Sequence, residues 1–187
     1  MKKILLYSFV FVTALLVFHA SDVMAERDKF IDIQEVNSDS GITAWLVEDH
    51  HVPVIAFDFA FLDAGAKNDQ ADKQGLSRLV SNTLDEGAGD LESQAFQKEL
   101  RDLSISLSFN SGRDTFGGSV KTLSKNKERA FALLKLALTE PRFDADSVQR
   151  MRQANQSRIR SSLSDPNWMA ARLLNDKAYA GHPYALN

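Results

Sequence analysis

The chain has 187 residues, with 22 basic and 25 acidic side chains, and 44% of its residues are apolar. This apolar fraction is too high for a disordered tail, and the absence of cysteine excludes a disulfide scaffold and any thiolate metal site. The net charge of −3 argues against a nucleic-acid-binding protein, because such proteins need a cationic face. A globular domain remains, large enough to bury roughly two-thirds of its unfolded surface.

Residues 1–25 have the three parts of a secretory signal peptide. Lys2 and Lys3 precede the apolar stretch Ile4–Phe18, and a Val-Met-Ala sequence ending at Ala25 supplies a small-residue cleavage site. The apolar stretch is about 15 residues long, fewer than the roughly 20 that a membrane-spanning helix needs. We therefore expect cleavage after Ala25 and a mature chain that is free of the membrane.

The first part of the mature chain, residues 26–187, has patterns typical of strands. Ile31–Val36 alternates apolar and polar residues, a turn cluster follows, and Ile42–Val47 fits the returning strand of a hairpin. Val54–Leu62 is nearly all apolar, which predicts a strand that is buried on both faces.

Helices and a second hairpin follow. Gly75–Asp85 is predicted to be helical, because apolar residues recur there with a period of about 3.6 residues. Arg78, Ser81, Asn82 and Asp85 are predicted to lie on the opposite, polar side. The other expected elements are a helix from Asp90 or Ser93 to about Leu103, strands Ile105–Phe109 and Thr115–Leu123, and helices Glu128–Leu138, Asp144 to about Leu163, and Asn167–Tyr179.

The order of these elements, βββ-αα-ββ-ααα, indicates an α+β fold. We expect an antiparallel-rich sheet with helices packed on one side. The closing segment Gly181–Asn187 has the composition of a turn that leads onward. We therefore expect residues 26–187 to be a domain that is truncated at its C-terminal end, within a longer protein.

Six short motifs occur in a defined order along the mature chain. They are Val47–Pro53, Phe61–Gly65, Gly75–Ser77, Leu84–Ala88, Glu140–Phe143 and Gly181–Tyr184. In this order and spacing the sequence resembles the N-terminal domain of the insulinase/pitrilysin family of zinc metallopeptidases. The resemblance implies that family's LuxS-like metallopeptidase fold.

Active members of that family carry an H-x-x-E-H motif on the helix that is equivalent to Gly75–Asp85. The two histidines lie one turn apart and bind the same Zn²⁺, the glutamate activates the metal-bound water, and a downstream helix supplies a carboxylate ligand. In this chain Arg78, Ser81 and Asn82 occupy the three motif positions, and the long helix has no Asp or Glu between Ser147 and Ser164. Arginine repels a dication, serine is too weak a base, and asparagine is a poor zinc ligand. The resemblance thus implies a member without catalytic residues, metal or cofactor of its own.

The resemblance also implies a role. In bacterial pairs of this family one subunit can lack zinc, so we expect a non-catalytic subunit of a periplasmic peptidase in a Gram-negative bacterium. It would pair with a zinc-bearing homologous subunit, the only place where zinc is expected, and would enclose a peptide or unfolded polypeptide. The alternatives are a structural or assembly protein of the same fold and, less favoured, an active zinc metalloendopeptidase with other ligands.

A candidate peptide-binding strand comprises Leu107, Ser108, Phe109 and Asn110. In active relatives the equivalent strand lies at a sheet edge beside the metal, where a substrate adds as a further strand through main-chain hydrogen bonds. The alternation of polar and apolar residues predicts one polar face and one buried face. Propensity alone does not distinguish an edge strand from an inner strand, so both interpretations stay open.

Other polar side chains are interpreted as structural. His50 and His51 are adjacent and point apart, which is typical of a solvated loop and not of a metal site. Asp85 and Glu86, beside glycines at a helix end, are interpreted as exposed and unpaired. The arginines of the long helix are interpreted as a solvated face, with a basic strip that faces a partner as the alternative; they are Arg150, Arg152, Arg158 and Arg160.

We predict that export removes residues 1–25, because the charged, apolar and small-residue parts occur in the order that signal peptidase recognises. N-terminal sequencing of the exported protein should therefore begin at Glu26. Substitution Ala25→Arg should leave the precursor uncut, since a large charged residue replaces the small one at the cleavage site. Recovery of chains that begin at Met1 from the membrane fraction of the unaltered protein would contradict the prediction.

Overall fold

A computed structural model describes residues 31–186, so the predicted signal peptide lies outside the described residues. The chain divides into two compact units, with the boundary between His51 and Val52. Within residues 31–186, no helix combines the length and the apolar character that crossing a bilayer requires.

The first unit contains a β-hairpin. Strands β1 (Gln34–Asn37) and β2 (Thr43–Leu46) pair antiparallel, as predicted, but both are shorter than the sequence pattern suggests. The turn between them is held by the Ser38 hydroxyl, which accepts a hydrogen bond from the Ile42 N–H at 3.0 Å. Gly41 in this turn has a φ of 83°, a left-handed conformation that favours glycine.

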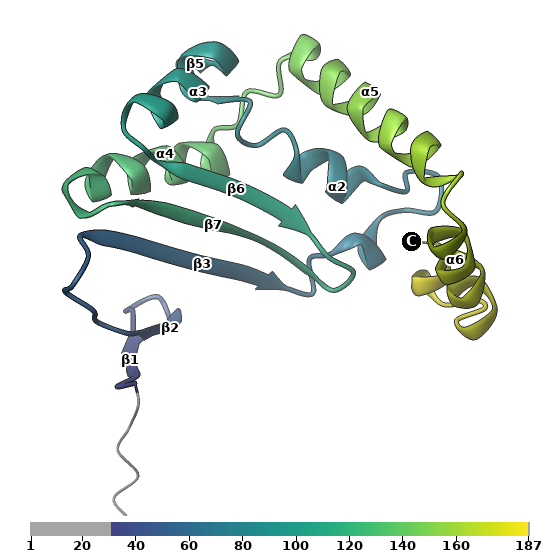
Figure 1. The fold of residues 1–187 in the computed structure, drawn as a ribbon, viewed down its shortest axis with the longest axis horizontal. Helices are drawn as coiled ribbons and strands as arrows, with labels where there is room; N and C mark the ends of the chain where they lie inside the picture. Colours follow the sequence, from purple (N-terminus) through teal and green to yellow (C-terminus); the bar gives the residue numbers. More distant parts are fainter. Residues whose placement is uncertain (1–30, 187) are drawn as a thin grey trace, which may run out of the picture. The chain divides into compact units, whose positions relative to one another are not determined.

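The second unit is built on a three-stranded antiparallel sheet with the order β3-β7-β6 (Figure 1). Its strands are β3 (Val54–Leu62), β6 (Ser106–Ser111) and β7 (Thr115–Leu123). The predicted bounds of β3 and β7 are confirmed to the residue, whereas β6 begins one residue later than predicted and continues two residues further.

The prediction that β3 is buried on both faces is wrong. Phe57 and Phe59 pack against the core, but Asp58 and the alanines on either side of it are exposed. The strand lies at one edge of the sheet, and Ala56, Asp58, Ala60 and Leu62 on its second face are all exposed. The apolar run therefore overstated the burial, because the core packs against the other face of the strand.

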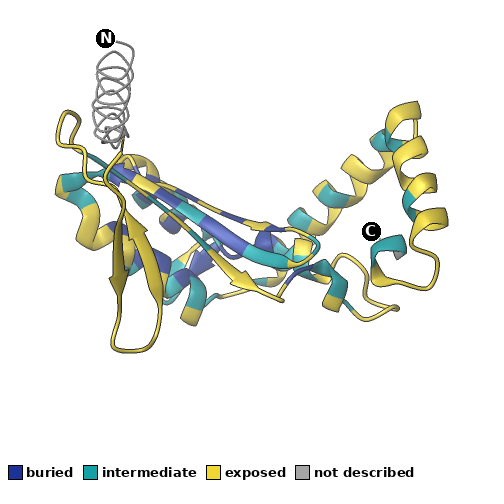
Figure 2. Cartoon of the chain, turned by 90° about the horizontal axis from the view of Figure 1, so that it is seen from below, coloured by how far each residue is buried: buried dark blue, intermediate teal, exposed yellow. Residues whose placement is uncertain are grey.

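Helices α3 (Ser93–Asp102) and α4 (Lys127–Thr139) carry their buried residues into one core with the sheet. Phe96 and Leu133 are fully buried there. Burial in β6 alternates strictly, with Leu107, Phe109 and Ser111 buried and the residues between them exposed. Figure 2 shows the buried residues concentrated in the sheet and the helices behind it. The expected arrangement of a sheet with helices on one side is confirmed.

The remaining helices are α2 (Leu76–Ser81), α5 (Ala145–Ser162) and α6 (Pro166–Ala178). Three short 3₁₀ helices are η1 (Ala66–Asn68), η2 (Ser124–Asn126) and η3 (Pro183–Leu186). The predicted order of elements is confirmed, with one addition. A hairpin of the two-residue strands β4 (Gly87–Ala88) and β5 (Leu91–Glu92) separates α2 from α3.

Helix α2 contacts both β6 and α5, and it lies between them (Figure 1). It ends at Ser81, four residues before the predicted end, and a turn carries the chain to Leu84. The helix that carries the family's zinc motif is therefore short and has neighbours on two sides.

Candidate functional site

The start of α2 is fixed by the Asp69 side chain. Its carboxylate accepts hydrogen bonds from the Gly75 N–H at 3.0 Å and the Ser77 N–H at 3.1 Å. Gly75 has a φ of 88°, so the chain enters the helix through a left-handed residue that favours glycine. These contacts set the direction in which the following turn presents its side chains.

The three zinc-motif positions have three different environments. Arg78 is exposed, and Ser81 is buried with 1% exposure and donates its hydroxyl hydrogen to the Arg78 carbonyl at 2.9 Å. Asn82 is half-buried, and its Nδ2 donates to Oδ1 of Asn155 on α5 at 2.7 Å. The polar side of α2 that was predicted to carry Ser81 is therefore not all exposed to solvent, because α2 contacts both β6 and α5.

Asn155 is the site residue that the sequence interpretation missed. It lies on the helix where active family members carry their third, carboxylate ligand, and it contacts the second histidine position directly. The only available signal was the absence of Asp and Glu between Ser147 and Ser164, which does not indicate which polar side chain of that helix faces α2.

The side chains that face one another here do not fit zinc. A guanidinium, a buried hydroxyl and two amides provide no anionic or imidazole ligand, and zinc sites are built from such ligands. Among residues 31–186, no group of three His, Cys, Asp or Glu side chains is placed to hold a metal ion. Instead, a neutral hydrogen bond between Asn82 and Asn155 joins α2 to α5, and the cationic side chain of Arg78 lies beside it.

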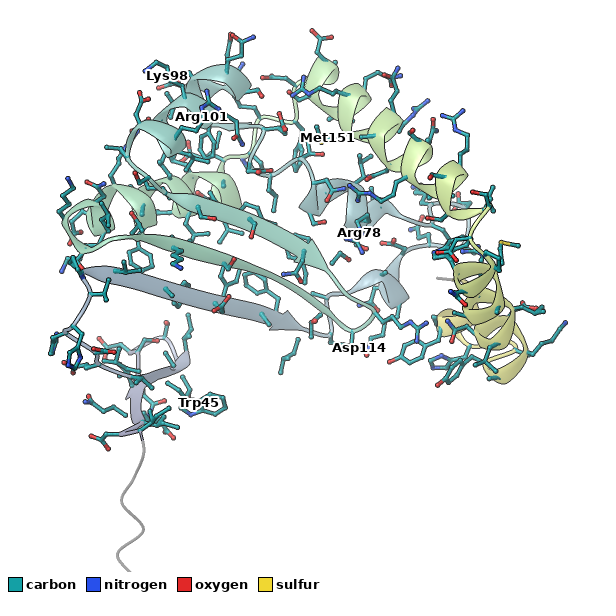
Figure 3. All side chains as sticks on the ribbon, in the orientation of Figure 1. Trp45, Arg78, Lys98, Arg101, Asp114 and Met151 are labelled. Carbon is teal, nitrogen blue, oxygen red and sulfur yellow. The ribbon has the colours of Figure 1, made fainter. Side chains whose placement is uncertain are left out.

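A cavity of about 270 Å³ lies where α2, α5 and β6 meet. Figure 3 shows Arg78 on α2 and Met151 on α5 in the layer between α5 and the sheet. The residues that line the cavity include Ser81, Asn82, Ser108, Phe109, Met151 and Asn155. The structure therefore brings the replaced zinc motif next to part of the candidate peptide-binding strand.

Strand β6 pairs only with β7 among the described strands, so it is the second edge of the sheet. The Gly112 N–H donates to the Thr115 carbonyl at 2.9 Å, which marks a hydrogen-bonded pair at the hairpin end. Bonded and non-bonded pairs alternate along an antiparallel ladder, so Ser108 bonds to Ser119 across the sheet. The backbone N–H and C=O groups of Leu107 and Phe109 therefore point away from β7, toward the open edge.

The interpretation of Asp85 and Glu86 as exposed and unpaired is wrong. Both are half-buried, and Glu86 forms an ion pair with Arg150 and accepts a hydrogen bond from the Ser93 hydroxyl at 2.7 Å. Burial raises the pKa of the Asp85 carboxyl above its usual range, and the neighbouring Glu86 charge raises it further. These carboxylates connect α2 to the elements after it, which spacing in the sequence does not reveal.

The arginines of α5 divide between two environments. Arg150 pairs with Glu86, and Arg158 lines the cavity beside Asn82. Arg152 and Arg160 are exposed, as expected for a solvated face. In the first unit, His50 and His51 are exposed side chains that pair with Glu48 and Asp49 at 3.2 and 2.5 Å, in agreement with the solvated-loop interpretation.

Comparison with known proteins decides the family. Residues 60–187 match the model of the insulinase family, peptidase family M16. The chain belongs to the insulinase family. The expected resemblance is thereby confirmed, and the sequence places the chain with members of this family that are not peptidases.

The relatives of this insulinase-family chain include proteins described as non-peptidases. It is 24% identical, over 152 residues, to the non-peptidase homolog YmxG of Helicobacter pylori, covering 81% of this chain and 35% of that protein. The fold is similar to the crystal structure of a peptidase M16 inactive domain from Pseudomonas fluorescens, with a TM-score of 0.75, 23% identity and coverage of 82% and 37%. A protease from Helicobacter pylori matches with a TM-score of 0.70, 18% identity and coverage of 83% and 38%. The chain thus spans little more than a third of the length of these relatives.

We predict that the wild-type protein binds no stoichiometric zinc and that Asn155 marks the missing ligand position. The double variant Arg78→His, Asn82→His should bind zinc weakly, because two imidazoles leave the ion under-coordinated. Adding Asn155→Glu should tighten binding by roughly tenfold or more, since a carboxylate then faces the second imidazole. Titration against a chromophoric chelator measures both affinities.

The matched control for this series places the new carboxylate at an exposed position of the same helix. Gln153→Glu, added to the double variant in place of Asn155→Glu, should leave zinc affinity unchanged. Equal gains from the two glutamates would show that Asn155 does not face the motif position.

We predict that Asp85→Asn stabilises the protein at neutral pH. A raised folded-state pKa means that the folded protein holds the proton more tightly than the unfolded chain, so the wild type loses stability as pH rises from below the ordinary value of 3.8. The variant avoids this loss, so its advantage in the free energy of unfolding should be present at pH 7 and should shrink toward pH 3. Chemical denaturation across this pH range measures it.

Glu99→Gln is the opposing control. Hydrogen bonds from Arg129 lower the pKa of the Glu99 carboxyl, so this variant should be less stable than wild type at pH 7, with a deficit that shrinks on acidification. A stability deficit of Asp85→Asn that grows as pH rises toward 7 would contradict the assignment.

Proposed function

We propose that this chain is part of a non-catalytic subunit that pairs with a zinc-bearing homologue and forms one wall of a peptide-binding chamber in the periplasm. The observation that carries the proposal is the open edge of β6 beside a helix whose zinc motif is replaced. The similarity to a non-peptidase homolog supports the non-catalytic part of it.

The geometry of β6 suits an added strand. The backbone groups of Leu107 and Phe109 point toward the open edge, while the side chains of the same residues are anchored in the core. A peptide that pairs with this edge gains main-chain hydrogen bonds and needs no catalytic side chain from the wall. The cavity between β6, α2 and α5 gives room for side chains of such a peptide.

Peptide hydrolysis in this arrangement needs a second subunit. Arg78, Ser81, Asn82 and Asn155 offer no metal ligand set and no general base, so water activation must come from elsewhere. A homologue that carries the intact H-x-x-E-H motif supplies both, and its peptide would be held against the edge of β6.

The test uses the intact protein, co-expressed with a homologue from the same genome that has an intact H-x-x-E-H motif. We expect the two chains to co-purify and the complex to cleave an unstructured peptide faster than either subunit alone. Cleavage by the zinc-bearing subunit alone at the rate of the complex would contradict a peptide-binding role. A stable complex without any peptidase activity would indicate an assembly role instead.

Strand addition is tested on the peptide and not on β6, because proline at Ser108 would remove a donor of the β6–β7 ladder itself. Two versions of one substrate carry N-methyl groups on alternate residues, in opposite phase. Only one phase faces β6, so one version should lose affinity for the complex and the other should bind normally. Equal affinity of both versions would exclude pairing with the strand edge.

A further inference from the structure

A second and larger cavity, of about 660 Å³, adjoins the replaced zinc motif. Four different elements each contribute one arginine to its lining: α2, the β6–β7 turn, α5 and α6. These residues are Arg78, Arg113, Arg158 and Arg172. No Asp or Glu of the described residues lines this cavity, although the whole chain carries a net charge of −3. We call it the arginine pocket.

No guanidinium group of the pocket forms an ion pair with a carboxylate of the described residues. Arg113 lies 5.2 Å from the ring centre of Tyr184, and Arg172 lies 5.4 Å from that of Trp168, so both are oriented by aromatic rings. Within residues 31–186, neither Arg78 nor Arg158 forms an ion pair. Their donors are therefore available to an anionic ligand.

Arginines elsewhere in the same unit behave differently. The guanidinium groups of Arg129, Arg142 and Arg150 each contact a carboxylate, of Glu99, Asp144 and Glu86 respectively. Three arginines outside the pocket thus have acidic partners, whereas none of the four that line it forms an ion pair among the described residues. An uncompensated group of cations is unfavourable for the folded protein, and an anion bound among them would relieve the repulsion.

Acidic side chains in the loops beside the pocket are already engaged. Asp69 accepts hydrogen bonds from the start of α2, and Asp114 accepts one from the Tyr184 hydroxyl at 2.6 Å. Asp114 also pairs with Lys67 at 3.3 Å. These carboxylates hold the pocket walls together. The charge of Asp114 also acts on the neighbouring Arg113, but none of these carboxylates forms an ion pair with Arg78 or Arg158.

The pocket has apolar lining as well as charge. Ile159, Leu163 and Trp168 line it, and the first two are more than half exposed. Asn155 and Arg158 line both this pocket and the cavity beside β6, so the two spaces adjoin. Asp85 and Glu86 line the cavity beside β6, whereas the only charged residues that line the arginine pocket are arginines, so a ligand that enters both spaces would place its carboxylates in the arginine pocket. Backbone hydrogen-bonding groups, apolar side chains and carboxylates are together the chemistry of an acidic peptide.

We propose that the arginine pocket binds carboxylate groups of a peptide that lies along β6 and so selects acidic peptides. The inference rests on the proposed peptide-binding function and adds a substrate class to it. The carboxylates can come from Asp and Glu side chains or from a free C-terminus, and charge-assisted hydrogen bonds to arginine recognise both.

Fluorescence anisotropy with the intact protein tests the inference on three labelled peptides of one backbone. The first contains glutamates and has both ends blocked, the second replaces each glutamate by glutamine, and the third is the glutamine peptide with a free C-terminus. The acidic peptide should bind at least roughly tenfold tighter than its blocked glutamine counterpart at low salt, and this preference should fall as salt rises. Tighter binding of the third peptide than of the second assigns the C-terminus as a further carboxylate source.

Variants then locate the preference. Arg158→Gln and, separately, Arg78→Gln should reduce the ratio of acidic to neutral affinity several-fold. Arg152→Gln, an exposed arginine on α5 outside the pocket, is the matched control and should keep the full ratio. Arg172→Gln provides a third pocket variant, on α6.

Two results would overturn the inference, and they differ in what else they overturn. Equal affinity for all three peptides, or a preference that survives the pocket variants and falls with Arg152→Gln, refutes the arginine pocket while peptide binding itself stands. Absence of binding for every peptide, by the intact protein and by its complex with the zinc-bearing homologue, refutes both the pocket and the proposed function.

Discussion

The position of α2 between the open edge of β6 and the long helix α5 determines what this domain can do. In active members of the family that layer holds a metal whose ligands join the two helices. Here the Asn82–Asn155 hydrogen bond makes the corresponding connection, and the Ser81 hydroxyl donates to the Arg78 carbonyl of the same helix. The Asn82–Asn155 bond holds α2 against α5 without the zinc ion that joins the two helices in active members. The edge of β6 stays accessible beside them.

The replacement of the zinc motif also changes which positive charges lie near α2 and α5. A zinc site places a dication between α2 and α5, and this chain places guanidinium groups around a neighbouring cavity. Guanidinium binds carboxylates in a planar, directional way but does not coordinate a water molecule and lower its pKa as zinc does. The four arginines therefore offer charge for anionic groups without a metal ligand set, and the Helicobacter relative is described as a non-peptidase homolog.

Local sequence patterns predicted the fold well wherever periodicity was clear. Strands Val54–Leu62 and Thr115–Leu123 were found to the residue, because the first is a nearly continuous apolar run and the second begins just after a turn. The errors came from long-range contacts. Helical periodicity places Ser81 on the polar side of its helix, and only the packing of α2 against two neighbours shows that it is buried.

The candidate site was predictable in part for the same reason. Motif spacing identified Arg78, Ser81 and Asn82, since those positions lie within one helix turn of each other. Asn155 and the Glu86–Arg150 pair could not be found that way, because their partners lie more than sixty positions apart in sequence. The arginine pocket draws on four separate elements, so no local pattern could have indicated it.

The amide pair between α2 and α5 has a consequence for where the wall can operate. Neither amide titrates over the range in which proteins fold, and neither depends on a supply of metal. A chelator that strips a zinc-bearing subunit of its ion has nothing to remove from this contact, and mild acid does not protonate it. In a metal-poor compartment the two subunits of such an assembly would respond differently. The zinc-bearing subunit would lose its catalytic activity, while this chain would keep its structure and its capacity to bind a peptide.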